Sequence, residues 1–210
     1  MLPGMDEARQ IREFWFGKGR LDEATAELRA GLWFGAGSQE QQLALDEEIR
    51  RRFGALIERA ARGELDSWAD GTRRRLSLIL LLDQFPRNVH RGTSRAFAQD
   101  DRALELTLSG MQSGADAALE PLERMFFFMP LQHSESLEVQ DEAVAAYRRL
   151  LGESPPELKR TLEASLEYAE QHREIIRRYG RFPHRNRALG RINTPAEKAY
   201  LANNPARFGQ

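Results

Sequence analysis

A dense group of basic side chains lies in the last quarter of the chain, where binding chemistry is first expected. Between residues 172 and 191 the sequence carries two histidines, a single acid, Glu174, and seven arginines: Arg173, Arg177, Arg178, Arg181, Arg185, Arg187 and Arg191. The formal net charge of the whole chain is −1, so the other segments are net acidic and this one is locally positive. Guanidinium groups match carboxylate and phosphate oxygens in pairs, and the segment therefore predicts a site for an anionic ligand.

The same short pattern occurs twice, each time after a predicted helix. Gln84-Phe85-Pro86-Arg87-Asn88 and Arg181-Phe182-Pro183-His184-Arg185-Asn186 both contain Phe-Pro followed by Arg-Asn. Each pattern places guanidinium and amide groups on a turn that proline stiffens. If the two turns meet, they form a donor-rich pocket in which Asp83, His133 and Glu135 are the acid–base members.

Two ionisable residues stand where an apolar side chain is expected. Asp83 directly follows the apolar stretch 76–82, and His172 falls on the inward stripe of a long amphipathic helix. An unpaired buried charge is very costly, so we expect a cation beside Asp83. A structural explanation exists for each residue as well. Asp83 can anchor a helix end to an arginine, and His172 can be a hydrogen-bonded core histidine.

Composition and motifs exclude several classes of protein. The near-neutral charge argues against a general nucleic-acid binder, and the longest apolar runs are far too short to span a bilayer. The chain has no cysteine and no signal pattern at its start, which fits a cytoplasmic protein. No H-E-x-x-H spacing, P-loop or G-x-G-x-x-G pattern occurs, so we expect neither a metal nor a cofactor. The oligomeric state is left open.

Helices are expected to carry all of these side chains. Apolar residues recur near the 3.6-residue helical period, with breaks at glycine and proline, in residues 39–62, 72–85, 94–111, 135–151 and 154–179. For 72–85, length and leucine richness favour a central buried helix over a buried strand, and Pro86 is expected to end it. The segments read as successive antiparallel hairpins over residues 39–85, 94–130 and 135–179. The sequence thus predicts a single all-α domain over 1–210, laid out like a tetratricopeptide-repeat (TPR) array.

Three motifs together resemble a known bacterial family. LDQFPRNVHRG at 82–92, FMPLQHSE at 128–135 and YGRFPHRNRALGR at 179–191 are similar to those of domain-of-unknown-function family 924. The resemblance covers nearly the whole chain and implies a TPR-like, right-handed all-α superhelix, while the family name implies no activity. Tyr179, where the family usually has phenylalanine, and the pair Ile192-Asn193 depart from the pattern away from the expected pocket. The motif residues that carry over are Asp83, Gln84, Arg87, Asn88, Arg91, His133, Glu135, His172, Arg181, His184, Arg185 and Asn186.

Three functions remain open at this stage. In the first, a TPR-like groove binds a small anionic ligand or an acidic peptide through Gln84, Arg87, Asn88, Arg91, Arg181, His184, Arg185 and Asn186. In the second, the protein is an enzyme whose arginines hold an anionic substrate while a histidine tuned by a carboxylate moves a proton, the candidates being His133, Glu135, His172 and Asp83. In the third, the polar residues form a buried network that only stabilises the fold.

Overall fold

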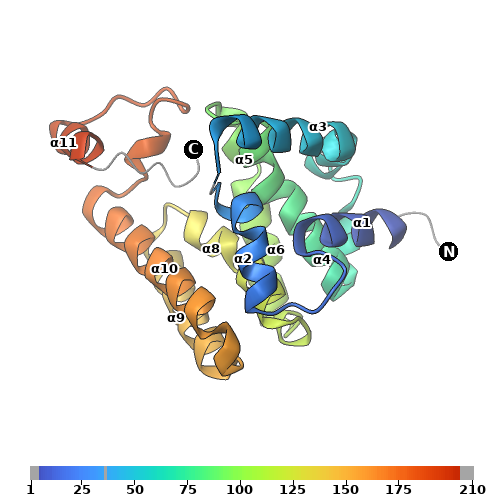
Figure 1. Cartoon of the computed structure of the whole chain (residues 1–210). Helices are drawn as coiled ribbons and strands as arrows, with labels where there is room; N and C mark the ends of the chain where they lie inside the picture. Colours follow the sequence, from blue (N-terminus) through green and yellow to red (C-terminus); the bar gives the residue numbers. More distant parts are fainter. Residues whose placement is uncertain (1–4, 36, 204–210) are drawn as a thin grey trace.

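The computed structural model describes residues 5–35 and 37–203, and all regular secondary structure in these ranges is helical (Figure 1). The α-helices are α1 (Met5–Phe16), α2 (Glu23–Phe34), α3 (Gln39–Ala61), α4 (Thr72–Ile79), α5 (Phe85–Val89), α6 (Asp100–Gln112), α7 (Pro121–Phe127), α8 (Met129–His133), α9 (Leu137–Glu153), α10 (Lys159–Tyr179) and α11 (Pro195–Asn203). A π-helical turn, η2 (Leu80–Gln84), joins α4 to α5, and the 3₁₀ turns are η1 (Asp66–Asp70), η3 (Ser94–Phe97), η4 (Asp116–Ala118), η5 (Pro156–Leu158) and η6 (Pro183–Arg185). The all-α prediction is confirmed. Among the described helices, none combines the length and apolar character needed to cross a membrane.

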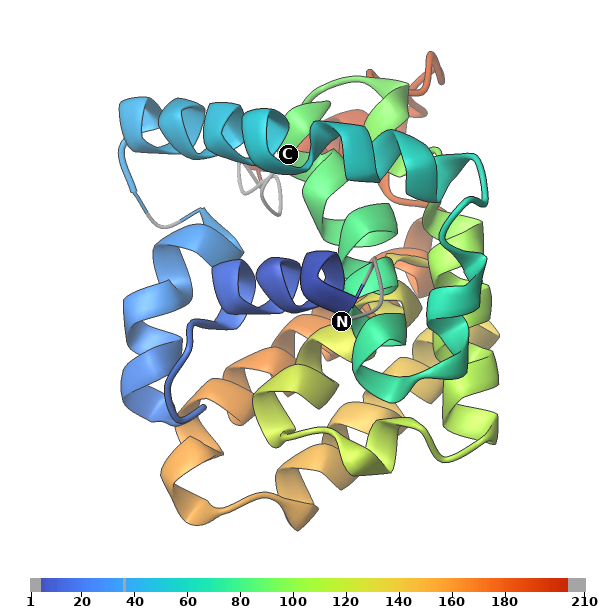
Figure 2. The ribbon, with the colours of Figure 1, turned by 90° about the vertical axis from the view of Figure 1, so that its right-hand side faces the viewer.

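The helices pack as a long hairpin beside a more compact group. α9 and α10 form the hairpin, orange in Figure 1, which corresponds to the hairpin predicted over 135–179. In the other group α3 packs on α5 and α1 packs on α4, with α3 lying along the top of the view in Figure 2. The short helix α8 contacts α6, α9 and α10, and so joins the two groups. The regular repeat of a TPR array stays a prediction.

The central helix continues past the proline that was expected to end it. An α-helical proline clashes with the carbonyl four residues earlier and lacks an N–H. Here the π turn η2 precedes Pro86, and the N–H of Phe85 bonds to the oxygen of Leu80, five residues back. This wider turn accommodates the proline without ending the helix, and the helical path continues through α5 to Val89. Asp83 therefore lies inside the π turn and not in a last helical turn, so the prediction that the helix ends at Pro86 is wrong.

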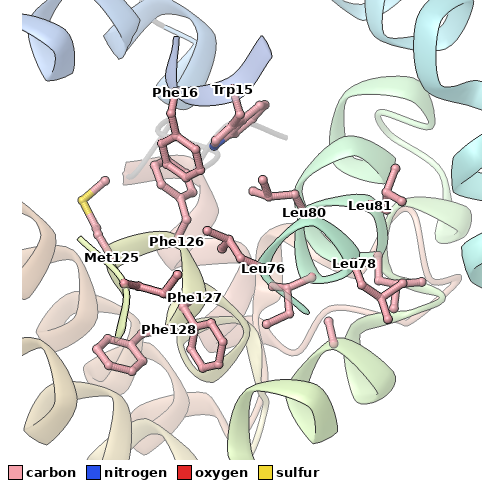
Figure 3. Close-up of a cluster of buried hydrophobic side chains, with 14 of the residues drawn as sticks. Trp15, Phe16, Leu76, Leu78, Leu80, Leu81, Met125, Phe126, Phe127 and Phe128 are labelled. Atoms are coloured by element: carbon pink, nitrogen blue, oxygen red, sulfur yellow. The ribbon is translucent and has the colours of Figure 1, made fainter. Parts of the chain in front are cut away.

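The apolar stretch before Asp83 is enclosed, as its sequence predicts. Leu76 and residues 78–82 are buried, and Figure 3 shows several of them beside the aromatic side chains of α1 and α7. The ring centroid of Phe126 lies 5.5 Å from that of Trp15 and 5.5 Å from that of Phe16, with edge-to-face geometry. Aromatic pairs of this kind stabilise a core beyond their buried area. Because Phe126 and its two successors are buried directly before α8, the core determines where α8 lies.

Gly110 in α6 lies where a side chain would be too close to its neighbours. A Cβ there would lie 2.5 Å from Phe127 Cζ and 3.0 Å from Arg75 Cδ. Gly110→Ala should therefore lower the free energy of unfolding by about 1–3 kcal/mol, because overpacking outweighs the better helix propensity of alanine. Gly54→Ala in α3 is the matched control, since its nearest neighbour would be Arg50 Cγ at 4.0 Å.

Urea unfolding measures both glycine variants. We expect Gly54→Ala to stabilise the protein by roughly 0.5–1 kcal/mol, as alanine does at an open helical site. An unchanged unfolding midpoint for Gly110→Ala would mean that the Phe127 ring moves aside without cost.

Candidate functional site

The three sequence motifs meet at the end of α8. His133 Nδ1 lies 2.6 Å from Asp83 Oδ1, and Arg185 Nη1 donates to the backbone oxygen of His133 at 3.1 Å. The backbone N–H of Phe182 donates to Glu135 Oε1 at 2.8 Å. Residues that are remote in the sequence are therefore in direct contact.

Asp83 and His133 form a hydrogen-bonded pair, here called the Asp83–His133 dyad. Asp83 has no exposed surface, and it also accepts hydrogen bonds from Gln84 Nε2 and from Arg87 Nη2. Burial by itself raises the pKa of Asp83, but the neighbouring His133 and Arg87 lower it overall, so the carboxyl group is ionised at neutral pH. Burial, and next the charge of Arg87, lower the pKa of His133 below 6.5. A neutral His133 donates from Nδ1 to the carboxylate, and its lone pair is therefore on Nε2.

His172 is a second buried imidazole near the dyad. Its Nδ1 donates to the backbone oxygen of Tyr168 at 2.7 Å, and its ring centroid lies 6.5 Å from that of His133. Burial is the main cause that lowers the pKa of His172 to about 3, so this ring is neutral at physiological pH. Both histidines therefore lack charge, and each has its tautomer set by an acceptor on Nδ1.

Arg87 and Arg185 share a carboxylate, Asp100, that the sequence did not single out. Arg87 Nη2 lies 2.9 Å from Asp100 Oδ1, and Arg185 Nη1 lies 3.1 Å from Asp100 Oδ2. The guanidinium group of Arg185 also lies 4.5 Å from the centroid of the Phe182 ring. Both arginines are thus bound to groups of the same chain, where the sequence predicted a clamp for a ligand.

A second carboxylate that the sequence did not single out, Asp46 of α3, holds the end of the central helix. Asp46 Oδ1 accepts from Asn88 Nδ2 at 2.9 Å and from Arg91 Nη2 at 3.1 Å. Its Oδ2 accepts from Arg91 Nε at 3.0 Å, so the arginine binds the carboxylate with two nitrogens. Asp46 looks like an ordinary surface acid of an amphipathic helix in the sequence, and only the packing of α3 on α5 brings it to Arg91.

The basic loop after α10 is held in place by acids of the same chain. Arg181 binds Glu197 through Nε at 2.6 Å and Nη2 at 2.9 Å. Arg191 binds Glu135 through Nη1 at 2.7 Å and Nη2 at 3.0 Å. Nearby, Asn186 donates to the side-chain oxygen of Asn193, and burial lowers the pKa of His184 to about 3. The loop therefore carries little unbalanced charge, although its sequence is strongly basic.

A pocket with a volume of ≈1010 Å³ lies between α10 and the helices α2, α5 and α8. Half of the predicted residues line it, namely Gln84, Arg87, Asn88, Arg91, His133 and His172. Apolar and aromatic side chains form much of the remaining wall, including Trp33, Phe34, Met129, Tyr168 and Ile175. The other predicted residues are not part of the lining: Asp83, Glu135, Arg181, His184, Arg185 and Asn186. Arg181, Arg185 and Asn186 hold the loop and do not line the pocket. The structure therefore corrects the prediction that these residues contribute hydrogen-bond donors to the pocket wall.

The chemistry available at this wall is proton transfer and hydrogen bonding. His133 has its Nδ1 fixed by a carboxylate, and no hydrogen bond to Nε2 occurs within the described residues. A histidine held in this way can accept a proton from a bound molecule. Within the same part of the chain, no three histidine, cysteine, aspartate or glutamate side chains are grouped so as to hold a metal ion.

Acid is expected to release the contact between Arg181 and Glu197. The hydrogen bonds from Arg181 are the main cause that lowers the pKa of Glu197 from 4.5 to about 2. Because this pKa is depressed in the folded state, the contribution to stability is fully present above pH 4.5 and is lost as the pH falls toward 2. The stability difference between wild type and Glu197→Gln should therefore shrink over that range.

Denaturant unfolding at a series of pH values measures this difference. Glu163→Gln is the control, because Glu163 is exposed and lies 3.6 Å from Lys159 in a pair of the kind that contributes little. A difference that stays constant from neutral pH down to about pH 2 would show that Glu197 is not the group that titrates.

Two comparisons relate the chain to known proteins. The model of a family described as bacterial protein of unknown function (DUF924) matches residues 11–205. The structure is similar to that of a protein of unknown function from Agrobacterium tumefaciens, with a TM-score of 0.78 and 34% sequence identity over 95% of this chain and 98% of that chain. A search of curated proteins finds no match. Both positive results agree with the resemblance seen in the three motifs.

Proposed function

The chain belongs to the DUF924 family of bacterial proteins of unknown function, and we propose that its pocket binds a small organic substrate from which His133 removes a proton. In this proposal the protein is an enzyme that uses general base catalysis. The family name carries no activity, so the proposal rests on the geometry of the site.

The observation that supports this proposal most is the Asp83–His133 dyad at the pocket wall. The 2.6 Å contact fixes the ring orientation and keeps the proton of the neutral imidazole on Nδ1. Nε2 is then the basic atom, on a residue that lines a pocket large enough for an organic molecule. The lowered pKa of His133 keeps this base unprotonated at neutral pH, which is the state that general base catalysis needs.

Binding of a small anion is the second candidate function, and Arg91 favours it. This side chain lines the pocket and is 30% exposed, more than the other arginine of the wall, Arg87. Its Nε and Nη2 already bind Asp46, however, so a ligand anion has to compete with a carboxylate of the protein. For this reason we place anion binding second.

Incubation with a bacterial metabolite extract in deuterated water tests the proposed enzyme. Mass spectrometry follows metabolites that are consumed, formed or gain deuterium, and the wild-type protein is compared with His133→Asn. Asparagine can still donate from Nδ2 to Asp83 but has no group in the place of Nε2. We expect at least one metabolite to change with wild type and not with the variant. Equal changes with both proteins would contradict the role of His133.

A further inference from the structure

Two buried amide side chains, Gln84 and Asn88, place hydrogen-bond acceptors at the pocket wall. Gln84 Nε2 lies 2.5 Å from Asp83 Oδ2, and Asn88 Nδ2 lies 2.9 Å from Asp46 Oδ1. A carboxylate has no proton to donate, so the amide nitrogen must face it in each case, which sets the orientation of both amides. The amide oxygens therefore point away from the carboxylates. In the described part of the chain, neither oxygen takes part in a hydrogen bond.

His133 adds a third acceptor to the same wall. Its Nδ1–H is bound to Asp83, so Nε2 has a lone pair and no proton. Gln84 and Asn88 are only 7% and 9% exposed, so the pocket is where their remaining polar atoms can be reached. A ligand that satisfies these three acceptors must bring hydrogen-bond donors.

The two arginines at the wall, Arg87 and Arg91, do not outweigh its hydrogen-bond acceptors. Arg87 donates to Asp83, to Asp100 and to the backbone oxygen of Ala96, and Arg91 binds Asp46 with two nitrogens. Each positive charge at the wall thus faces at least one carboxylate. An anion entering the pocket would meet these carboxylates as well as the guanidinium groups.

The wall that α10 contributes favours positive charge. Glu167, Glu170 and Glu174 line the pocket from this helix. Glu170 binds Arg148 at 3.1 Å and Glu174 binds Arg177 at 2.6 Å, whereas no arginine or lysine of the described residues pairs with Glu167, so Glu167 supplies the negative charge of this wall. Trp33 and Tyr168 are aromatic residues of the same lining, and aromatic faces attract cations. Leu32, Phe34, Met129 and Ile175 add apolar surface to the lining, which suits the hydrocarbon body of a ligand.

We infer that the pocket binds primary amines with an apolar or aryl body, the ammonium group donating to Gln84 Oε1, Asn88 Oδ1 and His133 Nε2. An ammonium group has three donors and no acceptor, which matches the acceptors Gln84 Oε1, Asn88 Oδ1 and His133 Nε2. This inference rests on the proposed function, because the ammonium N–H that donates to Nε2 is then the proton that His133 removes, which leaves a neutral amine and an imidazolium beside Asp83. The charge of an ammonium ligand is opposite to that of the anionic ligand that the arginine-rich sequence predicts.

Three compounds of nearly equal shape test the inference by isothermal titration calorimetry with the full-length protein: 3-phenylpropylamine, 3-phenylpropan-1-ol and 3-phenylpropanoate. We expect the amine to bind at least about tenfold more tightly than the carboxylate, since one charge-assisted hydrogen bond is worth that factor or more. Tighter binding of the carboxylate, equal binding of all three compounds, or no binding of the amine would each overturn the inference.

Gln84→Met connects the selectivity to the wall, because methionine keeps the length of the side chain and removes its oxygen, together with the Nε2 group that donates to Asp83. We expect this variant to raise the Kd of the amine about tenfold. Gln112→Met is the control, since Gln112 is exposed at the end of α6 and is not part of the pocket lining, and it should leave the Kd unchanged. If Gln84→Met weakens the fold, Glu167→Gln provides a second arm, which should also raise the Kd of the amine. Unchanged amine binding in both Gln84→Met and Glu167→Gln would overturn the inference.

Failure of this inference is distinguishable from failure of the proposed function. Turnover of a carboxylate substrate that depends on His133 would refute amine selectivity and leave the general base in place. Tight binding of the amine, with metabolite turnover identical in wild type and His133→Asn, would support the ligand class and refute the general base.

Discussion

Asp83→Asn is expected to lower the free energy of unfolding by about 3 kcal/mol, the lower part of the range for breaking a buried ion pair. Three donors point at the two carboxylate oxygens, from Gln84 Nε2, Arg87 Nη2 and His133 Nδ1. An asparagine of the same shape has one oxygen and one NH₂ group, so at least one donor of the protein would then face another donor. The loss stays near 3 kcal/mol because Arg87 keeps its contact with Asp100.

Thermal and urea unfolding measure the effect of Asp83→Asn. For a chain of this length the expected loss corresponds to a fall in Tm of about 6–12 °C. Asp116→Asn is the matched control. It also removes an aspartate beside an arginine, but Asp116 lies 3.7 Å from Arg124, which keeps Glu153 at 2.8 Å. We expect this control to cost less than about 1 kcal/mol.

The pH dependence of the difference gives an independent check. The pKa of Asp83 in the folded protein lies below its ordinary value of 3.8. Its contribution to stability is therefore fully present above pH 3.8 and is lost as the pH falls below that value. The stability of Asp83→Asn should approach that of wild type in acid. A variant as stable as wild type at neutral pH would show that the buried charge is dispensable.

Local sequence patterns predicted the central helix but did not predict that its helical path continues past Pro86. The 3.6-residue period reports which face of a segment is buried, and it predicted a central helix before Asp83 that the structure confirms. The π turn depends on how the backbone relaxes around one proline inside an already buried helix. Nothing in the pattern of side chains distinguishes that outcome from a helix end, and so the helix end was placed too early.

The motifs predicted that the remote segments meet, but not which groups balance the arginines. Asp100 is an acid in the first turn of α6, where such residues occur for reasons of helix stability alone. Arg185 binds Asp100, which lies 85 residues earlier in the sequence. Arg91 binds Asp46, which lies 45 residues earlier. These pairs are created by the packing of helices, and no spacing in the sequence marks them. The prediction of an anion clamp followed from counting arginines without their partners.

His133→Asn is expected to lower the rate of the proposed reaction about 10²–10⁴-fold, the usual contribution of a positioned general base. Stability should change little, because asparagine can keep the hydrogen bond to Asp83 Oδ1 and the backbone oxygen of residue 133 still accepts from Arg185. His90→Asn is the control. His90 also has a pKa below 6.5, mainly through burial, but it does not line the pocket, so this variant should keep the full rate.

The pH profile separates a general base from a buried network that only stabilises the fold. Because the pKa of His133 lies below 6.5, the wild-type rate should hold as the pH falls from neutral to 6.5 and decrease only at lower pH, where the imidazole gains a proton. His133→Asn should lose this acidic limb together with most of the rate. If the buried network only stabilises the fold, Asp83→Asn lowers the stability, whereas His133→Asn keeps the wild-type reaction rate and the wild-type pH profile. The two substitutions at the ends of one 2.6 Å hydrogen bond therefore report on different properties, stability at Asp83 and proton transfer at His133.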